Sequence, residues 1–320
     1  MPSRRESDHR TSRSLSTFLS MATRSDILPA ATTLGPVHLQ VAELGRSLEY
    51  YEAVLGFRVL ERGGAGAVLA AHGDDTPLVR LQEHSGAASV PRRGRLGLYH
   101  YAILLPDRAA LGRHVGHLAE IGARPGASDH IVSEALYLTD PDGLGIEVYA
   151  DRPRAGWEWR DGELVMATDS LDLDDLVAAA GGERWTGMPP GTRVGHVHLH
   201  VGALRQAAAF YRDALGFEPT VRGYPGALFL SAGGYHHHLG LNTWTGPGAA
   251  PAGPADARLL EWTVVLPQAD QAEAVARRVE SAGFPVAPTA DGWLLTDPWG
   301  TSVRVVSAAP TLDAARRGRT

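Results

Sequence analysis

The chain has 320 residues, of which 44% are hydrophobic and 21% charged, with a formal net charge of −6, 14 histidines and no cysteine. This composition predicts a soluble, cytoplasmic globular protein of about two domains. The lack of cysteine excludes disulfides, thiolate metal sites and a cysteine nucleophile. Basic residues are spread along a slightly acidic chain, and no apolar stretch approaches the roughly 20 residues that span a bilayer, so neither nucleic acid nor a membrane is an expected partner.

Residues 1–33 are rich in Arg and Ser and show no hydrophobic periodicity. They predict a disordered N-terminal tail. A basic, Ser-rich start is also typical of a transit peptide, but the acidic residues Glu6 and Asp8 argue against one. The sequence leaves open whether translation starts at Met1 or Met21.

The rest of the chain consists of two homologous halves. Corresponding segments recur about 160 positions apart, which is typical of an internal duplication. The pairs are residues 47–57 with 207–217, 103–106 with 264–267, and 140–143 with 297–300.

Each half divides into two units, in which a short alternating strand is followed by an amphipathic helix that ends at a glycine and then by further strands. The opening strands are predicted at residues 37–41, 99–105, 195–201 and 260–266. In the second unit a helix is predicted to end near Gly122, and its His114 and His117 are expected to be solvated. Closing strands are predicted after Asp-Pro-x-Gly turns, at residues 145–149 and 302–306.

Four βαβββ units with a Tyr-x-x-x-Leu-Gly-Phe motif in each odd unit and Asp-Pro-x-Gly in each even unit resemble the vicinal oxygen chelate superfamily. The resemblance implies an α+β fold in which four modules form two tandem domains with cup-shaped mixed sheets. The implied domains are residues 34–151 (modules 1 and 2) and 194–308 (modules 3 and 4), with a connecting segment over 152–193 and a C-terminal tail over 309–320.

Strand alternation separates the polar side chains by face. In the third unit the apolar residues at positions 197, 199 and 201 are expected to face the helices, so that His196, His198 and His200 face the cup. By the same rule His100, Tyr137 and Glu147 of the second unit face the cup. Two imidazoles and one carboxylate form the facial triad of non-haem Fe(II) oxygenases, so the sequence predicts a metal held by His100, Glu147 and His196.

The run from Ser128 to Glu147 resembles the extradiol ring-cleavage signature, from which it departs at Ser128 itself. By this resemblance His130 and Tyr137 are hydrogen-bonding residues beside the metal, and Glu147 is the metal carboxylate. In the third unit the three consecutive histidines resemble the family's segment that carries the acid/base histidine. The register there favours His237, with His238 next.

The complete set requires units two and three to build one cup together. If unit one pairs with unit two instead, His38 becomes the third ligand. The pairing of units two and three is favoured because it also supplies the acid/base histidine. For His38, His198 and His200, lining of the pocket is expected more than metal contact. In the other cup Glu261 and Arg304 occupy the equivalent positions, where opposite charges predict a salt bridge in place of a lost metal site.

The resemblance implies an extradiol dioxygenase of the catechol 2,3-dioxygenase type that uses Fe(II), or alternatively Mn(II) or another divalent metal. Its substrates would be O2 and a small aromatic diol, catechol-type or hydroquinone-type, as in the catabolism of aromatic hydrocarbons. The alternatives are a glyoxalase-like isomerase or thiol transferase, which usually has a second metal carboxylate on the last strand of the partner unit, and a non-enzymatic small-molecule-binding or resistance protein of the same fold. The ring substituents and the oligomeric state, a homo-oligomer included, stay open.

Overall fold

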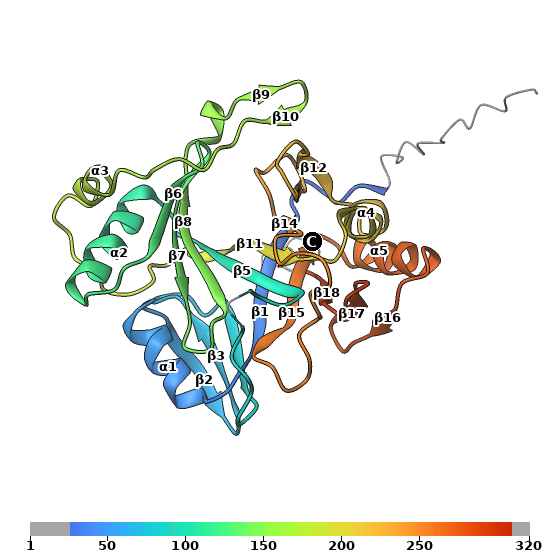
Figure 1. The fold of residues 1–320 in the computed structure, drawn as a ribbon, viewed down its shortest axis with the longest axis horizontal. Coiled ribbons are helices and arrows are strands. Elements are labelled where there is room, and N and C mark those ends of the chain that lie inside the picture. Colours follow the sequence, from blue (N-terminus) through green and yellow to red (C-terminus); the bar gives the residue numbers. More distant parts are fainter. Residues whose placement is uncertain (1–25, 92, 309–320) are drawn as a thin grey trace, which may run out of the picture.

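The computed structural model describes residues 26–91 and 93–308, which form two eight-stranded mixed sheets. Sheet I has the order β12-β13-β14-β11-β5-β8-β7-β6, and sheet II the order β16-β17-β18-β15-β1-β4-β3-β2 (Figure 1). Within the described residues no helix is long and apolar enough to cross a membrane.

Sheet I combines the second unit with the third. Its strands are β5 (Gly97–Leu104), β6 (Gly126–Asp129), β7 (Ser133–Thr139), β8 (Gly145–Asp151), β11 (Arg193–His200), β12 (Glu218–Val221), β13 (Ala227–Ser231) and β14 (Leu239–Asn242). At its centre the opening strands β5 and β11 pair antiparallel, and each pairs in parallel with the closing strand of its own unit. The pairing of unit two with unit three, which the sequence favoured, is therefore confirmed.

Sheet II combines the first unit with the fourth in the same way. Its strands are β1 (Thr33–Val41), β2 (Arg58–Gly63), β3 (Gly66–Ala70), β4 (Val79–Glu83), β15 (Arg258–Leu266), β16 (Val286–Pro288), β17 (Gly292–Thr296) and β18 (Ser302–Ser307). Each sheet thus takes one unit from each half of the duplicated sequence, and the predicted α+β fold of four modules is confirmed.

The helices lie outside the sheets, where the apolar alternation of the strands predicts them. They are α1 (Leu44–Ala53), α2 (Arg108–Glu120), α3 (Leu173–Ala178), α4 (Leu204–Ala208), which continues as a π-helix over Ala209–Ala214, and α5 (Ala269–Ser281). Gly56 follows α1 with φ +80°, a conformation that favours glycine, and a Cβ there would lie 2.6 Å from Nε1 of Trp185. His114 of α2 is fully buried, contrary to the prediction, because it packs against Trp185 of the connecting segment.

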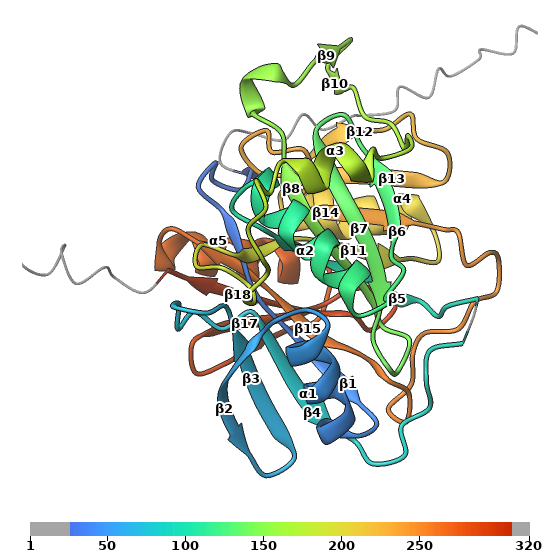
Figure 2. The same ribbon diagram turned by 90° about the vertical axis from the view of Figure 1, so that its left-hand side faces the viewer.

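The connecting segment crosses from β8 to β11 and has structure of its own. It contains a short 3₁₀-helix (Arg154–Gly156), the hairpin β9 (Trp159–Arg160) with β10 (Glu163–Leu164), and α3, which packs beside α2. The hairpin projects beyond sheet I in both views (Figure 2).

The predicted terminal tails are only partly within the described residues. Of the predicted N-terminal tail, residues 1–25 lie outside them, as does the predicted C-terminal tail over 309–320. Within residues 26–32, where the sequence predicts disorder, Leu28 and Thr32 are buried, and the backbone N–H of Leu28 donates to the carbonyl of Gly216.

Candidate metal centre

Three central strands of sheet I bring His100, Glu147 and His196 together. Ala102 of β5 pairs with His196 of β11 on one side and with Glu147 of β8 on the other. The side chains of His196 and Glu147 therefore project from the same face of the sheet, on neighbouring positions across the strands. His100 lies two residues before Ala102 on β5, so strand alternation brings it to that face as well.

The donor atoms of these three residues converge. Nε2 of His100 lies 3.0 Å and Nε2 of His196 lies 3.1 Å from the same carboxylate oxygen, Oε2 of Glu147. One ligand atom from each residue lies within 4.8 Å of the others, and all three side chains are buried. Donors that bind one ion at right angles, with bonds of about 2.1 Å, lie about 3 Å apart.

Nε2 of His100 is buried and has no partner of hydrogen-bond geometry, despite its distance to Glu147. A buried polar nitrogen without a hydrogen bond is costly unless something else binds it. The set of two imidazoles and one carboxylate, with this nitrogen aimed at the carboxylate, fits a divalent metal ion.

Electrostatics hold the three residues in the protonation states that a cation requires. Burial opposes ionisation of Glu147, but His196 and His100 outweigh it and hold the pKa of that carboxyl well below its usual range. Burial lowers the pKa of His100 and of His196, against the opposing effect of Glu147. Both imidazoles are thus favoured as neutral and the carboxylate as charged.

His130 and Tyr137 form a hydrogen-bonded pair beside this cluster. Nε2 of His130 lies 2.6 Å from the hydroxyl oxygen of Tyr137, and Nδ1 lies 2.7 Å from the carbonyl oxygen of Ala167. Because the carbonyl only accepts, Nδ1–H of a neutral His130 donates to it, and Nε2 accepts the tyrosine proton. Burial raises the pKa of Tyr137 well above its usual range, so the phenol keeps that proton.

The three consecutive histidines before β14 have three different environments. His237 lines the cavity beside the cluster of His100, Glu147 and His196, with its ring centroid 4.1 Å from that of His196. His236 is fully buried behind it and lies 3.0 Å from Asp151. His238 points away from the cavity, and its Nδ1 accepts the backbone N–H of Ala232.

A cavity of about 320 Å³ opens above the cluster. Ten residues line it besides His100, His130, Glu147 and His237, and no Arg or Lys is among the described residues of its wall. These ten are Tyr99, Ser128, Tyr137, Met166, Ala167, Thr168, His198, Tyr224, Phe229 and Trp244. The cavity therefore combines metal-type donors at its floor with largely aromatic walls.

His198 and His200 follow His196 on the same face of β11. His198 lines the cavity, and its Nε2 is buried without a hydrogen-bond partner. Gly240 leaves the space for this ring, since a Cβ there would lie 2.7 Å from Cγ of His198. His200 lies farther out, and its Nδ1 is 2.6 Å from Oδ1 of Asn242.

Sheet II has no comparable cluster among the described residues. Arg304 forms a bidentate ion pair with Glu261, through Nε at 2.8 Å and Nη2 at 2.9 Å, as the sequence predicts. His38 pairs with Glu261 in the register of β1 and β15 and lines a separate, open pocket. It is therefore remote from the metal-type donors of sheet I.

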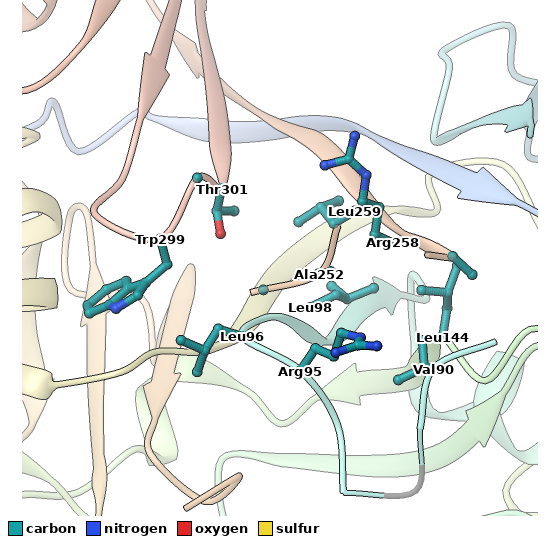
Figure 3. Close-up of a pocket in the computed structure, with 13 residues that line it drawn as sticks. Val90, Arg95, Leu96, Leu98, Leu144, Ala252, Arg258, Leu259, Trp299 and Thr301 are labelled. Carbon is teal, nitrogen blue, oxygen red and sulfur yellow. The ribbon is translucent and has the colours of Figure 1, made fainter. Parts of the chain in front are cut away.

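Another cavity lies where the loop before β5 meets β15 and the turn before β18 (Figure 3). Its volume is about 30 Å³, and Leu96, Leu98 and Leu259 contribute to its wall. None of the predicted site residues lines it. A space of this size holds one or two water molecules.

Sequence reasoning missed most of the aromatic wall. Strand alternation directs Tyr99 away from the cup, but the pairing of β5 with β11 skips this residue, and such a bulge redirects its side chain. Met166 and Thr168 come from the connecting segment and Trp244 from a loop, for which periodicity carries no signal.

A family model described as Glyoxalase/Bleomycin resistance protein/Dioxygenase superfamily matches residues 33–148 and 193–303. A catechol-2,3-dioxygenase from Bacillus subtilis (strain 168) is 48% identical over 271 residues, which cover 83% of this chain and 94% of that protein. Among solved structures, glyoxalase I from Zea mays is similar with a TM-score of 0.52 at 17% identity, covering 87% of this chain and 92% of that one. A presumed dioxygenase from Bacillus subtilis is similar with a TM-score of 0.59 at 14% identity, over 88% and 87%. At such identities the two structures show a shared fold alone.

Proposed function

The chain belongs to the glyoxalase/bleomycin resistance protein/dioxygenase superfamily, and we propose that it is an extradiol dioxygenase that opens a catechol-type or hydroquinone-type ring with O2. The observation that carries this proposal is the convergence of His100, Glu147 and His196, of which His100 and Glu147 line an aromatic cavity. The identity of 48% to a protein named catechol-2,3-dioxygenase supports it.

The proposed ligands of the metal are His100, Glu147 and His196, and the proposed ion is Fe(II), with Mn(II) as the alternative. Two neutral imidazoles and a carboxylate on one face leave coordination positions open, as in non-haem Fe(II) oxygenases. When bound, the ion supplies Lewis acidity toward a diol and redox chemistry toward O2. The single charge of Glu147 leaves the site with net positive charge, which favours a deprotonated diol oxygen.

The cavity is large enough for a substituted single-ring substrate. Its volume of about 320 Å³ exceeds the about 150 Å³ that holds a benzene molecule. Tyr99, Phe229 and Trp244 offer faces and edges against which an aromatic ring packs.

Three residues beside the proposed metal ligands would handle the proton and the substrate oxygens. His237 is the proposed acid/base, because it lines the cavity next to His196. A positioned imidazole contributes about 10²–10⁴-fold to a proton transfer. His130 and Tyr137 hold each other in place, and to hydrogen-bond to oxygen atoms of the reacting group they would exchange this mutual bond for new ones.

A glyoxalase-like isomerase has less support from the geometry. The position in unit three that corresponds to Glu147 is Gly240. Glu147 pairs with Ala102 of the opening strand β5, and Gly240 pairs with His198, the equivalent residue of the opening strand β11. A glycine offers no carboxylate for a second acidic ligand. The open space above Gly240 is filled by His198.

Anaerobic loading with Fe(II), followed by exposure to O2 and a panel of catechols and hydroquinones, tests the proposal. We expect O2 uptake in step with the formation of a yellow ring-opened semialdehyde. Bound iron without O2 uptake would point instead to the isomerase, and failure to bind any divalent metal would point to a non-enzymatic binding protein.

A further inference from the structure

A chain of hydrogen bonds leads from His237 away from the cavity. Nδ1 of His237 lies 2.8 Å from Nδ1 of His236, and Nε2 of His236 lies 3.0 Å from Oδ1 of Asp151. Neither His236 nor Asp151 lines the cavity. The side chain of His236 is fully buried, whereas that of Asp151 is 24% exposed.

The carboxylate of Asp151, at the end of this chain, fixes the direction of the hydrogen bonds. An ionised Asp151 only accepts, so Nε2–H of His236 donates to it. A neutral imidazole carries one N–H, so Nδ1 of His236 is an acceptor, and Nδ1–H of His237 donates to it. Nε2 of His237 then holds a free lone pair, on the side of the ring opposite to its bond with His236.

We propose that Asp151 and His236 are positioning residues that hold His237 in the Nδ1–H tautomer, with Nε2 presented to the cavity as a proton acceptor. This inference rests on the proposed function, in which His237 is the acid/base. In the proton transfer the substrate O–H bond breaks, the electron pair stays on oxygen, and a new N–H bond forms at Nε2 of His237. The cationic ring then donates Nδ1–H to His236, whose partner Asp151 supplies the compensating negative charge.

The surroundings of Asp151 and His236 restrict their motion. The hydroxyl of Tyr235 donates to Oδ1 of Asp151 at 3.1 Å, and the hydroxyl of Tyr149 lies 2.6 Å from that of Tyr235. The ring of Trp157 packs edge-on against His236, with centroids 5.4 Å apart. Asp151 is the last residue of β8, the strand that carries Glu147, so one strand sets the position of both groups.

A matched pair of substitutions tests the proposal. His236→Asn places a carbonyl oxygen near the former Nδ1, where it still accepts from His237 but does not reach Asp151. His236→Gln places its amide near the former Nε2, where it reaches Asp151 but not His237. We expect His236→Gln to lower kcat at least 10-fold more than His236→Asn does, with KM changed less than 3-fold and one metal per chain in both.

A merely structural role predicts the reverse order, because glutamine fills the volume of histidine better than asparagine. Equal kcat for the two variants, or kcat equal to that of the native enzyme, would likewise overturn the proposal. Asp151→Ala provides a second route that leaves the buried rings in place. We expect it to lower kcat with unchanged KM, and an unchanged kcat would count against the proposal.

A readout that does not depend on activity is the ¹⁵N NMR spectrum of the histidine rings in the metal-free protein. We expect the native His237 to be protonated at Nδ1, and its Nε2–H form to increase in His236→Gln. A native His237 protonated at Nε2, or a His236 protonated at both nitrogens, would overturn the proposal. If the native enzyme shows no ring cleavage, the proposed function fails, but the spectrum still tests the order of the hydrogen bonds.

Discussion

Replacing Glu147 by Gln should remove most of the metal affinity while leaving the fold intact. Glu147 supplies the only carboxylate of the His100–Glu147–His196 cluster, and its Oε2 lies about 3 Å from both imidazole nitrogens. Replacing a residue that only hydrogen-bonds to a metal ligand lowers the metal affinity about 10–100-fold. Loss of a charged ligand should therefore cost at least about 100-fold.

This loss translates into a measurable change in stability. At a free-metal concentration of about 1,000 Kd, a bound metal stabilises the native enzyme by about 4.1 kcal/mol. A 100-fold weaker site at the same concentration gives about 1.4 kcal/mol, so Glu147→Gln should lose about 2.7 kcal/mol of metal-induced stabilisation. Without metal Glu147→Gln should also be less stable than the native protein, because it lacks the charged form that His196 and His100 favour, and the measurement without metal subtracts this loss.

Urea unfolding with excess Mn(II) or anaerobic Fe(II), and again with a chelator, measures both quantities. Glu134→Gln is a matched control, since Glu134 is a buried glutamate of the adjacent strand β7 that binds Arg108 instead of the cluster. The control should lose the same stability with and without metal. Metal-induced stabilisation of Glu147→Gln within about 0.5 kcal/mol of the native value would refute the assignment of Glu147 as a ligand.

Three further outcomes follow from the same geometry. His237→Phe should retain one metal per chain but lower kcat by about 100-fold or more, measured as O2 uptake, and an unchanged kcat would move the acid/base elsewhere. Burial lowers the pKa of His114 to about 4, so as the pH falls below 6.5 this histidine is protonated in the unfolded chain before it is protonated in the native state. The free energy of unfolding should therefore fall by about 3 kcal/mol by pH 4. His114→Gln should remove this loss in acid-unfolding curves, whereas the control His117→Gln should not. Glu261→Gln should cost about 1 kcal/mol of stability and leave the metal stoichiometry at one per chain, whereas loss of the bound ion would place a ligand in sheet II.

The sequence was sufficient for those features that depend on periodicity. Repeat offsets aligned the four units, and alternation along 195–201 separated the apolar residues, now in the core, from His196 and His198 on the opposite face. The same rule failed at Tyr99, because a bulge changes the register at one residue. It also failed at His114, whose burial depends on a contact with Trp185 across about 70 positions of sequence.

The connecting segment shows why the remainder of the site could not be read from the units alone. It joins β8 of unit two to β11 of unit three, and its residues Met166, Ala167 and Thr168 line the cavity. Within this segment the carbonyl oxygen of Ala167 accepts a hydrogen bond from Nδ1–H of His130. The hydroxyl of Thr168 lies 3.2 Å from that of Tyr224 in unit three. The segment therefore both orients one predicted site residue and closes the cavity wall, a role that only the pairing of units two and three makes possible. Sheet II joins the first and last units instead. In sheet II the Glu261–Arg304 ion pair occupies the positions equivalent to the metal-type donors, so among the described residues one of two sheets of the same design holds a candidate metal site.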